Sequence, residues 1–154
     1  MIADVTRVSY ESFRDRTAGK KLVLLAPNSA YRGVLLGYFL RAPGEAPLYY
    51  RIPAGETTIP ALVRGLADEM DATLQPEDAA AFSGPLRSAL NDPSALRLAE
   101  ALAAGLGALR RSPAVLFIDE FDQLQVNADF HTFVMTLVHH LGPDTQIVIN
   151  ARAL

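Results

Sequence analysis

Four short apolar runs, separated by longer stretches with helical periodicity, constrain the fold of this 154-residue chain more than any other feature. The runs cover residues 21–26, 47–52, 115–120 and 146–150. Short apolar runs bounded by Pro, Gly or polar residues are typical of buried strands. Strands that alternate with helices form parallel sheets through right-handed crossovers. The pattern therefore predicts a single α/β domain over residues 1–154, with a mainly parallel sheet flanked by helices.

The spacing of apolar residues also predicts the helices between these strands. We expect helices over residues 32–41, from a cap at Thr57 or Thr58 to about residue 70, over 94–111 and over 129–141. Residues 75–92 contain Pro76, Gly84 and Pro85, which favour a short helix with loops. Residues 2–9 are a candidate for an added edge strand.

Composition and charge exclude several classes of protein. Half of the residues are hydrophobic and a fifth are charged, which is typical of a globular domain with a sizeable core. The formal charge of -3 offers no footprint for direct nucleic-acid binding. The chain has no cysteine, and its N-terminus lacks the apolar segment of a signal peptide. Apolar stretches are too short to span a membrane. We expect a cytoplasmic protein that contacts neither nucleic acid nor membrane directly.

The third apolar run ends in two carboxylates, Asp119 and Glu120. Open α/β sheets bind ligands beyond the carboxyl ends of their strands. In enzymes that handle phosphate, acids at this position hold magnesium and polarise water. Asp119 is therefore a candidate magnesium ligand and Glu120 a candidate catalytic residue, if the domain is active. The alternative is that both are a polar strand end that caps the following turn.

A phosphate-binding loop is the second half of such a site, and its expected position follows the first strand. The loop needs glycines, a lysine and a hydroxyl in the order Gly-x-x-x-x-Gly-Lys-Thr. The corresponding segment reads Ala26, Pro27, Asn28, Ser29, Ala30, Tyr31, Arg32 and Gly33. Tyr31 replaces a glycine, Arg32 replaces the lysine, and Gly33 lacks the hydroxyl that binds magnesium. The sequence therefore predicts no binding, or only weak binding, of ATP and magnesium.

The order of these motifs resembles the front half of the NTPase module of the STAND family, which includes large bacterial transcriptional activators. Ala26, Pro27 and Leu35 match the loop segment of that family, and the run from Val115 to Asp122 resembles its Walker B strand. The segment from Ile147 to Arg152 is similar to the strand that ends in Ser-Arg in these proteins. The resemblance covers residues 22–152, although the match over 53–111 is limited to spacing.

The resemblance implies a three-layer P-loop NTPase-like fold with strand order 1-4-3-2. It assigns Asp119 to the magnesium-associated acid and Glu120 to the acid that polarises water. It places Asn150 at the polar sensor position and Arg152 at the arginine that follows. The degenerate loop residues Asn28, Ser29, Ala30, Tyr31, Arg32 and Gly33 stand where a nucleotide would bind. Members continue with a helical lid and a winged helix, so the resemblance implies that this chain is either the N-terminal part of a longer module or a reduced stand-alone version.

These observations favour a degenerate NTPase-like regulatory module of a bacterial signalling or transcription protein. Such a module acts through contacts with other domains, a partner protein or a second copy, with weak or no nucleotide turnover. One alternative is a slow ATPase in which Arg32 replaces the lysine. A second alternative is a plain interaction module that presents an apolar helix face to a partner.

Overall fold

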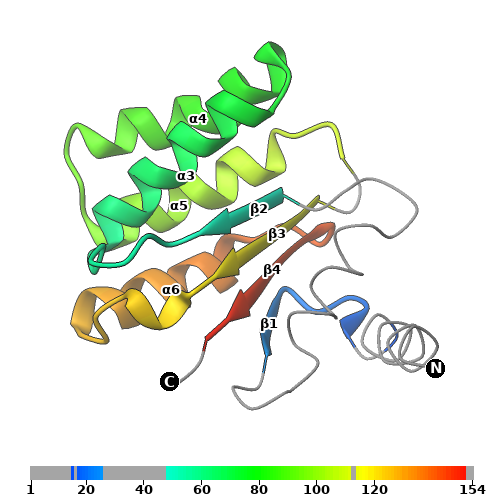
Figure 1. Cartoon of the computed structure of the whole chain (residues 1–154). Coiled ribbons are helices and arrows are strands. Elements are labelled where there is room, and N and C mark those ends of the chain that lie inside the picture. Colours follow the sequence, from blue (N-terminus) through cyan, green and yellow to red (C-terminus); the bar gives the residue numbers. More distant parts are fainter. Residues whose placement is uncertain (1–14, 16, 26–47, 112–113, 152–154) are drawn as a thin grey trace, which may run out of the picture.

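The computed structural model describes residues 15, 17–25, 48–111 and 114–151 of the chain. These residues contain four strands in one sheet, and Figure 1 shows their arrangement. The strands are β1 (Leu22–Leu25), β2 (Leu48–Arg51), β3 (Ala114–Asp119) and β4 (Thr145–Asn150). Their order is β1-β4-β3-β2, and every neighbouring pair is parallel. The predicted α/β fold, parallel sheet and strand order are confirmed.

Among the described residues, four helices lie on one face of the sheet (Figure 1). They are α3 (Ile59–Thr73), α4 (Pro76–Leu90), α5 (Ala95–Gly107) and α6 (Ala128–His140), and a short 3-10 helix, η1, covers Phe121–Gln123. Polar side chains cap three of them, as Thr58, Ser94 and Asn127 each accept a hydrogen bond from a backbone N–H in the first turn. These caps explain why α3, α5 and α6 each begin at the residue that follows the cap.

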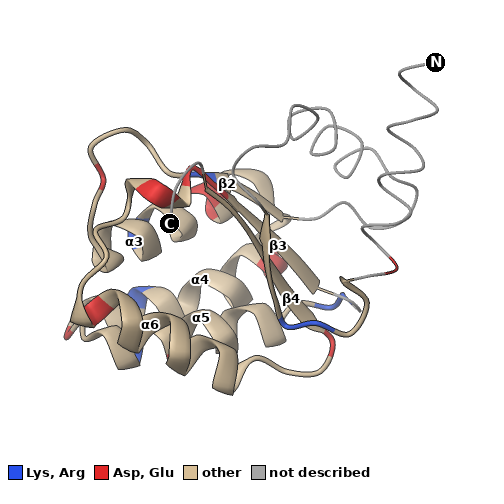
Figure 2. Cartoon of the chain, turned by 90° about the horizontal axis from the view of Figure 1, so that it is seen from below, with Lys and Arg blue, Asp and Glu red and all other residues tan. Residues whose placement is uncertain are grey.

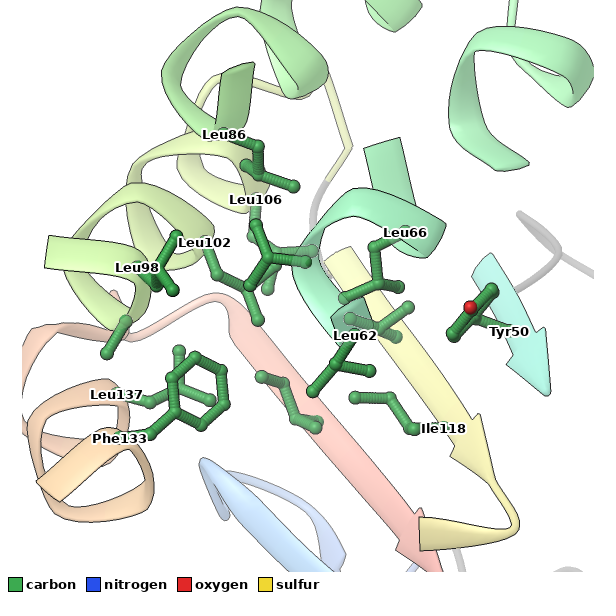
Figure 3. Packing of buried hydrophobic residues seen from close by; sticks show 14 of the residues in the cluster. Tyr50, Leu62, Leu66, Leu86, Leu98, Leu102, Leu106, Ile118, Phe133 and Leu137 are labelled. Carbon is green, nitrogen blue, oxygen red and sulfur yellow. The ribbon is translucent and has the colours of Figure 1, made fainter. Parts of the chain in front are cut away.

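The main core lies between these helices and the sheet. Figure 3 shows Leu62 and Leu66 of α3 between the helices and the strand residues Tyr50 and Ile118. On the α6 side, Phe133 and Leu137 point toward the leucines of α5. The large side chains that are less than 2% exposed include Leu62, Leu66, Leu86, Leu98, Leu102, Leu106 and Phe133. This cluster joins all four helices to the strands.

Both faces of the sheet are buried at the central strands β3 and β4, whose successive side chains alternate between the two faces. Residues Tyr50, Ile118 and Ile149 face the helices. Phe117 and Val148 form a second cluster with Val23 on the opposite face, where they are 1% and 0% exposed. This alternation explains why the strands are almost continuously apolar in sequence. It also fixes which face each polar residue at a strand end adopts.

The expectation of a short helix with loops over residues 75–92 was wrong. Residues 76–90 form α4, a continuous helix of 15 residues that contains Pro85. The helix is held by its packing, because Phe82 and Leu86 are fully buried and the Ser83 hydroxyl donates to the Ala67 carbonyl of α3 at 3.3 Å. Tertiary contacts therefore outweigh the local cost of a proline inside a helix.

Other differences from the sequence prediction are small. The helix α5 ends at Gly107 instead of continuing to residue 111, since the chain turns there and Leu109 packs into the core. The expected helix over residues 32–41 and the candidate edge strand over residues 2–9 lie outside the described residues. Within the described residues, the structure contains no helix that is both long and apolar enough to cross a membrane.

Candidate functional site at the carboxyl ends of the strands

Parallel pairing brings polar residues of three strands together at one edge of the sheet. Arg51 of β2 pairs with Asp119 of β3, and Ile118 of β3 pairs with Ile149 of β4, which places Asp119 beside Asn150. Side chains two residues apart on a strand share a face, so Tyr49 lies diagonally across from Asp119 on the face opposite the helices. Figure 2 shows acidic segments near the end of β2.

Asp119 accepts three hydrogen bonds from the described residues. Its Oδ1 atom accepts from the Asn150 side-chain nitrogen at 2.7 Å and from the Glu120 backbone N–H at 2.8 Å. Its Oδ2 atom accepts from the Tyr49 hydroxyl at 2.9 Å. We call Tyr49, Asp119 and Asn150 the Asp119 node. The node links the ends of β2, β3 and β4 through one carboxylate.

Tyr49 is held as a hydrogen-bond donor at neutral pH. Burial, the hydrogen bond to Asp119 and the negative charge of Asp119 raise the pKa of the Tyr49 hydroxyl from 10.0 to about 12. The ring packs against Phe117 with a centroid distance of 6.0 Å. Tyr49 was not among the residues that the sequence analysis selected. The combination of strand order and period-two alternation could have identified it, since both place Tyr49 beside the strand that carries Asp119.

Asn150 is almost completely buried, with 3% of its surface exposed. Its amide nitrogen donates to Asp119, while its Oδ1 atom has no donor among the described residues. A buried acceptor without a donor is costly, typically by about 1–3 kcal/mol. The sensor-like position of Asn150 therefore lies next to the candidate magnesium ligand, and its donor is directed at that carboxylate.

Glu120 changes the direction of the chain immediately after β3. Its backbone is in the left-handed region, with φ 58° and ψ 39°, and η1 begins at the next residue. A residue with a β-carbon seldom adopts this conformation, which is enriched at functional sites. The Glu120 carboxylate lies 3.8 Å from the guanidinium of Arg51, and its side chain is 11% exposed. The turn brings the second acid back against the end of β2.

Backbone hydrogen bonds tie the two loops that follow β2 and β3. The Ile52 N–H donates to the Asp119 carbonyl at 3.1 Å, and the Gln125 N–H donates to the Thr57 carbonyl at 2.9 Å. The segments 52–58 and 120–127 are therefore connected at both ends. A displacement of one loop is expected to move the other.

The predicted site residues divide into two groups. Asp119, Glu120 and Asn150 are brought together at this edge, as their positions in sequence suggested. The degenerate loop residues 28–33 and Arg152 lie outside the described residues. The structure therefore describes only the acidic half of the expected phosphate site.

The donor set around Asp119 does not fit direct coordination of magnesium. A carboxylate offers about four lone-pair positions, and three are taken here, including both positions on Oδ1. Magnesium requires oxygen ligands at about 2.0–2.1 Å in near-ideal octahedral geometry. Over the described stretches of chain, moreover, no group of three or more acidic or histidine side chains is arranged to hold a metal ion.

Comparison with known proteins adds no family assignment. No protein-family model matches this sequence, and no curated protein matches it.

Proposed function

We propose that this chain is a degenerate NTPase-like regulatory module that acts through contacts with other domains or subunits, with weak or no nucleotide turnover. The observation that carries the proposal is the Asp119 node. The acid that resembles the magnesium-associated residue of active relatives is held here by three donors of the protein itself. Its role is to fasten three strand ends together.

The sequence of the phosphate loop supports the same proposal. Tyr31, Arg32 and Gly33 stand where an active loop carries glycine, lysine and a hydroxyl residue. An acidic strand end that is satisfied internally and a loop without its ligands are consistent with each other. Together they favour a domain that has kept its architecture while losing the requirement for nucleotide.

The connected loops offer a route by which contacts could act. The node and the hydrogen bond between Gln125 and Thr57 join the ends of β2, β3 and β4 with the segments 52–58 and 120–127. A partner domain that binds at this edge would contact one connected unit. The proposed partners are other domains of a larger regulator, a separate protein or a second copy of the chain.

Calorimetric titration with ATP and magnesium tests this function. We expect no binding in the micromolar range for the natural chain. Micromolar binding that is lost in Asp119→Asn and retained in the control Asp129→Asn would overturn the proposal. Asp129 is a suitable control because it is exposed in the first turn of α6 and is not one of the three residues of the node. Circular dichroism should show that each variant is folded.

A second candidate function is slow ATP hydrolysis. The observation that favours it is the adjacency of Asp119, Glu120 and Asn150 at the carboxyl edge, where nucleotide-binding sheets place their catalytic groups. Phosphate release that depends on magnesium and is abolished by Glu120→Gln would support this candidate. Release that is unchanged in Glu120→Gln would indicate a contaminating activity.

A further inference from the structure

Tyr49 differs from the other two donors to Asp119 in the carboxylate oxygen to which it donates. The Glu120 N–H and the Asn150 amide both donate to Oδ1, whereas the Tyr49 hydroxyl donates to Oδ2. Oδ1 has therefore no lone pair to offer, and Oδ2 has one in addition to the one that faces Tyr49. A further ligand of the Asp119 carboxylate would therefore bind at Oδ2.

We propose that the Tyr49 hydroxyl competes with divalent cations for Oδ2 of the Asp119 carboxylate, so that a side chain of the neighbouring strand lowers the affinity of the acidic strand end for a cation. The inference rests on the proposed function, since it names a residue that weakens cation binding at the carboxyl ends of the strands. It adds a specific mechanism, in which a phenol on β2 occupies one of the two lone-pair positions of Oδ2 that a cation would use.

The surroundings of Asp119 show why a cation would be the ligand once the hydroxyl is gone. Asn150 presents a buried Oδ1 atom that has no donor among the described residues. Asp119 would then present an Oδ2 atom that has lost its Tyr49 donor, on the carboxylate to which Asn150 donates. Carboxylate and amide oxygens are the ligands that hard divalent cations prefer. The surplus of acceptors would favour such a cation over a neutral ligand.

Replacement of Tyr49 by phenylalanine isolates the hydroxyl. The ring of Tyr49 packs against Phe117, and phenylalanine retains this contact. The substitution removes a single hydrogen bond to a charged acceptor, which in proteins corresponds to roughly a factor of ten or more in an equilibrium constant. Affinity of the edge for a divalent cation should rise by about this factor.

Binding of Mn²⁺, measured through the loss of the free-ion electron paramagnetic resonance signal without nucleotide, tests the inference. We expect Tyr49→Phe to bind Mn²⁺ at least about tenfold more tightly than the natural chain. The gain should disappear in the double variant Tyr49→Phe, Asp119→Asn. Equal affinity of the natural chain and Tyr49→Phe would overturn the proposal, and so would a gain that persists without the Asp119 carboxylate.

Tyr50→Phe is the matched control, because it removes a phenol from the adjacent residue on the opposite face of the same strand. The Tyr50 hydroxyl donates to the Glu56 carboxylate at 3.4 Å, whereas the Tyr49 hydroxyl donates to Asp119. Its Mn²⁺ affinity should equal that of the natural chain, and a gain equal to that of Tyr49→Phe would overturn the proposal. If Tyr49→Phe does not fold, Tyr49→Leu removes the same hydroxyl and carries the same expectation.

The outcome is separable from the test of the proposed function. Tight binding of ATP with magnesium by the natural chain would refute the degenerate module. Failure of Tyr49→Phe to gain Mn²⁺ affinity would refute only the role of Tyr49. The first experiment uses the natural chain with nucleotide, and the second compares variants with the metal alone.

Discussion

Tyr49 and Tyr50 are adjacent on β2, yet the two faces of the sheet use them differently. Tyr50 faces the helices, is 7% exposed, and packs so closely on α3 that a β-carbon at Gly65 would collide with its hydroxyl. Tyr49 faces the other way and donates to the carboxylate of Asp119. On the helix side, apolar packing stabilises the fold. At the Asp119 node, hydrogen bonds fix the geometry of the side chains. A domain can therefore keep its core while the chemistry at its edge changes.

Truncation of a core leucine should produce the largest effect on the helix side. Leu102 of α5 is completely buried, so Leu102→Ala is expected to lower the free energy of unfolding by about 2–5 kcal/mol. Leu96 lies on the same helix but is 48% exposed, and Leu96→Ala should change the free energy of unfolding by less than about 0.5 kcal/mol. Urea denaturation measures both. Similar losses in the two variants would contradict the assigned core.

A close approach of two helices is the next test of the packed side. A β-carbon at Gly105 would lie 2.6 Å from the Phe82 carbonyl oxygen, so α4 and α5 would have to separate. Gly105→Ala should cost about 1–3 kcal/mol of unfolding free energy. Gly107 has open space around it, and Gly107→Ala should be neutral or stabilising by up to about 1 kcal/mol. The difference should appear in thermal or urea denaturation, and its absence would mean that the helices are packed more loosely.

Removal of the carboxylate tests the polar side of the comparison. Asp119→Ala leaves the Tyr49 hydroxyl and the buried Asn150 amide without their acceptor, and we expect a loss of about 1–3 kcal/mol. If Asp119 were an open ligand site with no structural part, its removal would leave stability unchanged or raised. Urea denaturation in the presence of a chelator distinguishes these results, because it excludes metal binding.

Alkaline pH provides the finest comparison of the two faces. The pKa of each hydroxyl is raised from 10.0 to about 12, mainly by burial, with Asp119 acting on Tyr49 and Glu56 acting on Tyr50. The unfolded chain therefore loses these protons first, so stability is intact below pH 10 and falls as the pH rises toward 12. Tyr49→Phe and Tyr50→Phe should each reduce the slope of unfolding free energy against pH in this interval. An unchanged slope in both would contradict the raised values.

The sequence predicted the strands because the signals there are strong, whereas their order came from the resemblance alone. The runs at 115–120 and 146–150 are short, apolar and bounded by polar residues, and the resemblance supplied the order 1-4-3-2. The sequence prediction was wrong at α4. There Pro85 and Gly84 locally favour a loop, while the buried contacts of Phe82 and Leu86 maintain a helix. Local propensity carries no information about such contacts.

Prediction of the site was limited by the same gap between local and long-range information. Asp119, Glu120 and Asn150 were identified, since each ends an apolar run. The donation from Tyr49 to Asp119 joins residues on two strands that are distant in the chain, and Arg51 approaches Glu120 only because Glu120 adopts positive φ. Neither contact has a signature within one segment. Both follow once register and face are known.

The excursion from β2 through α3, α4 and α5 to β3 has a consequence for the folding pathway. The strands are neighbours in the sheet, but three helices separate them in the chain, and α3 packs on α4 while α4 packs on α5. Those contacts are local, whereas pairing of β2 with β3 must close a long loop. Early assembly of the three helices shortens that loop before the strands meet. We expect the helices to be structured in the transition state, and the Asp119 node to form afterwards.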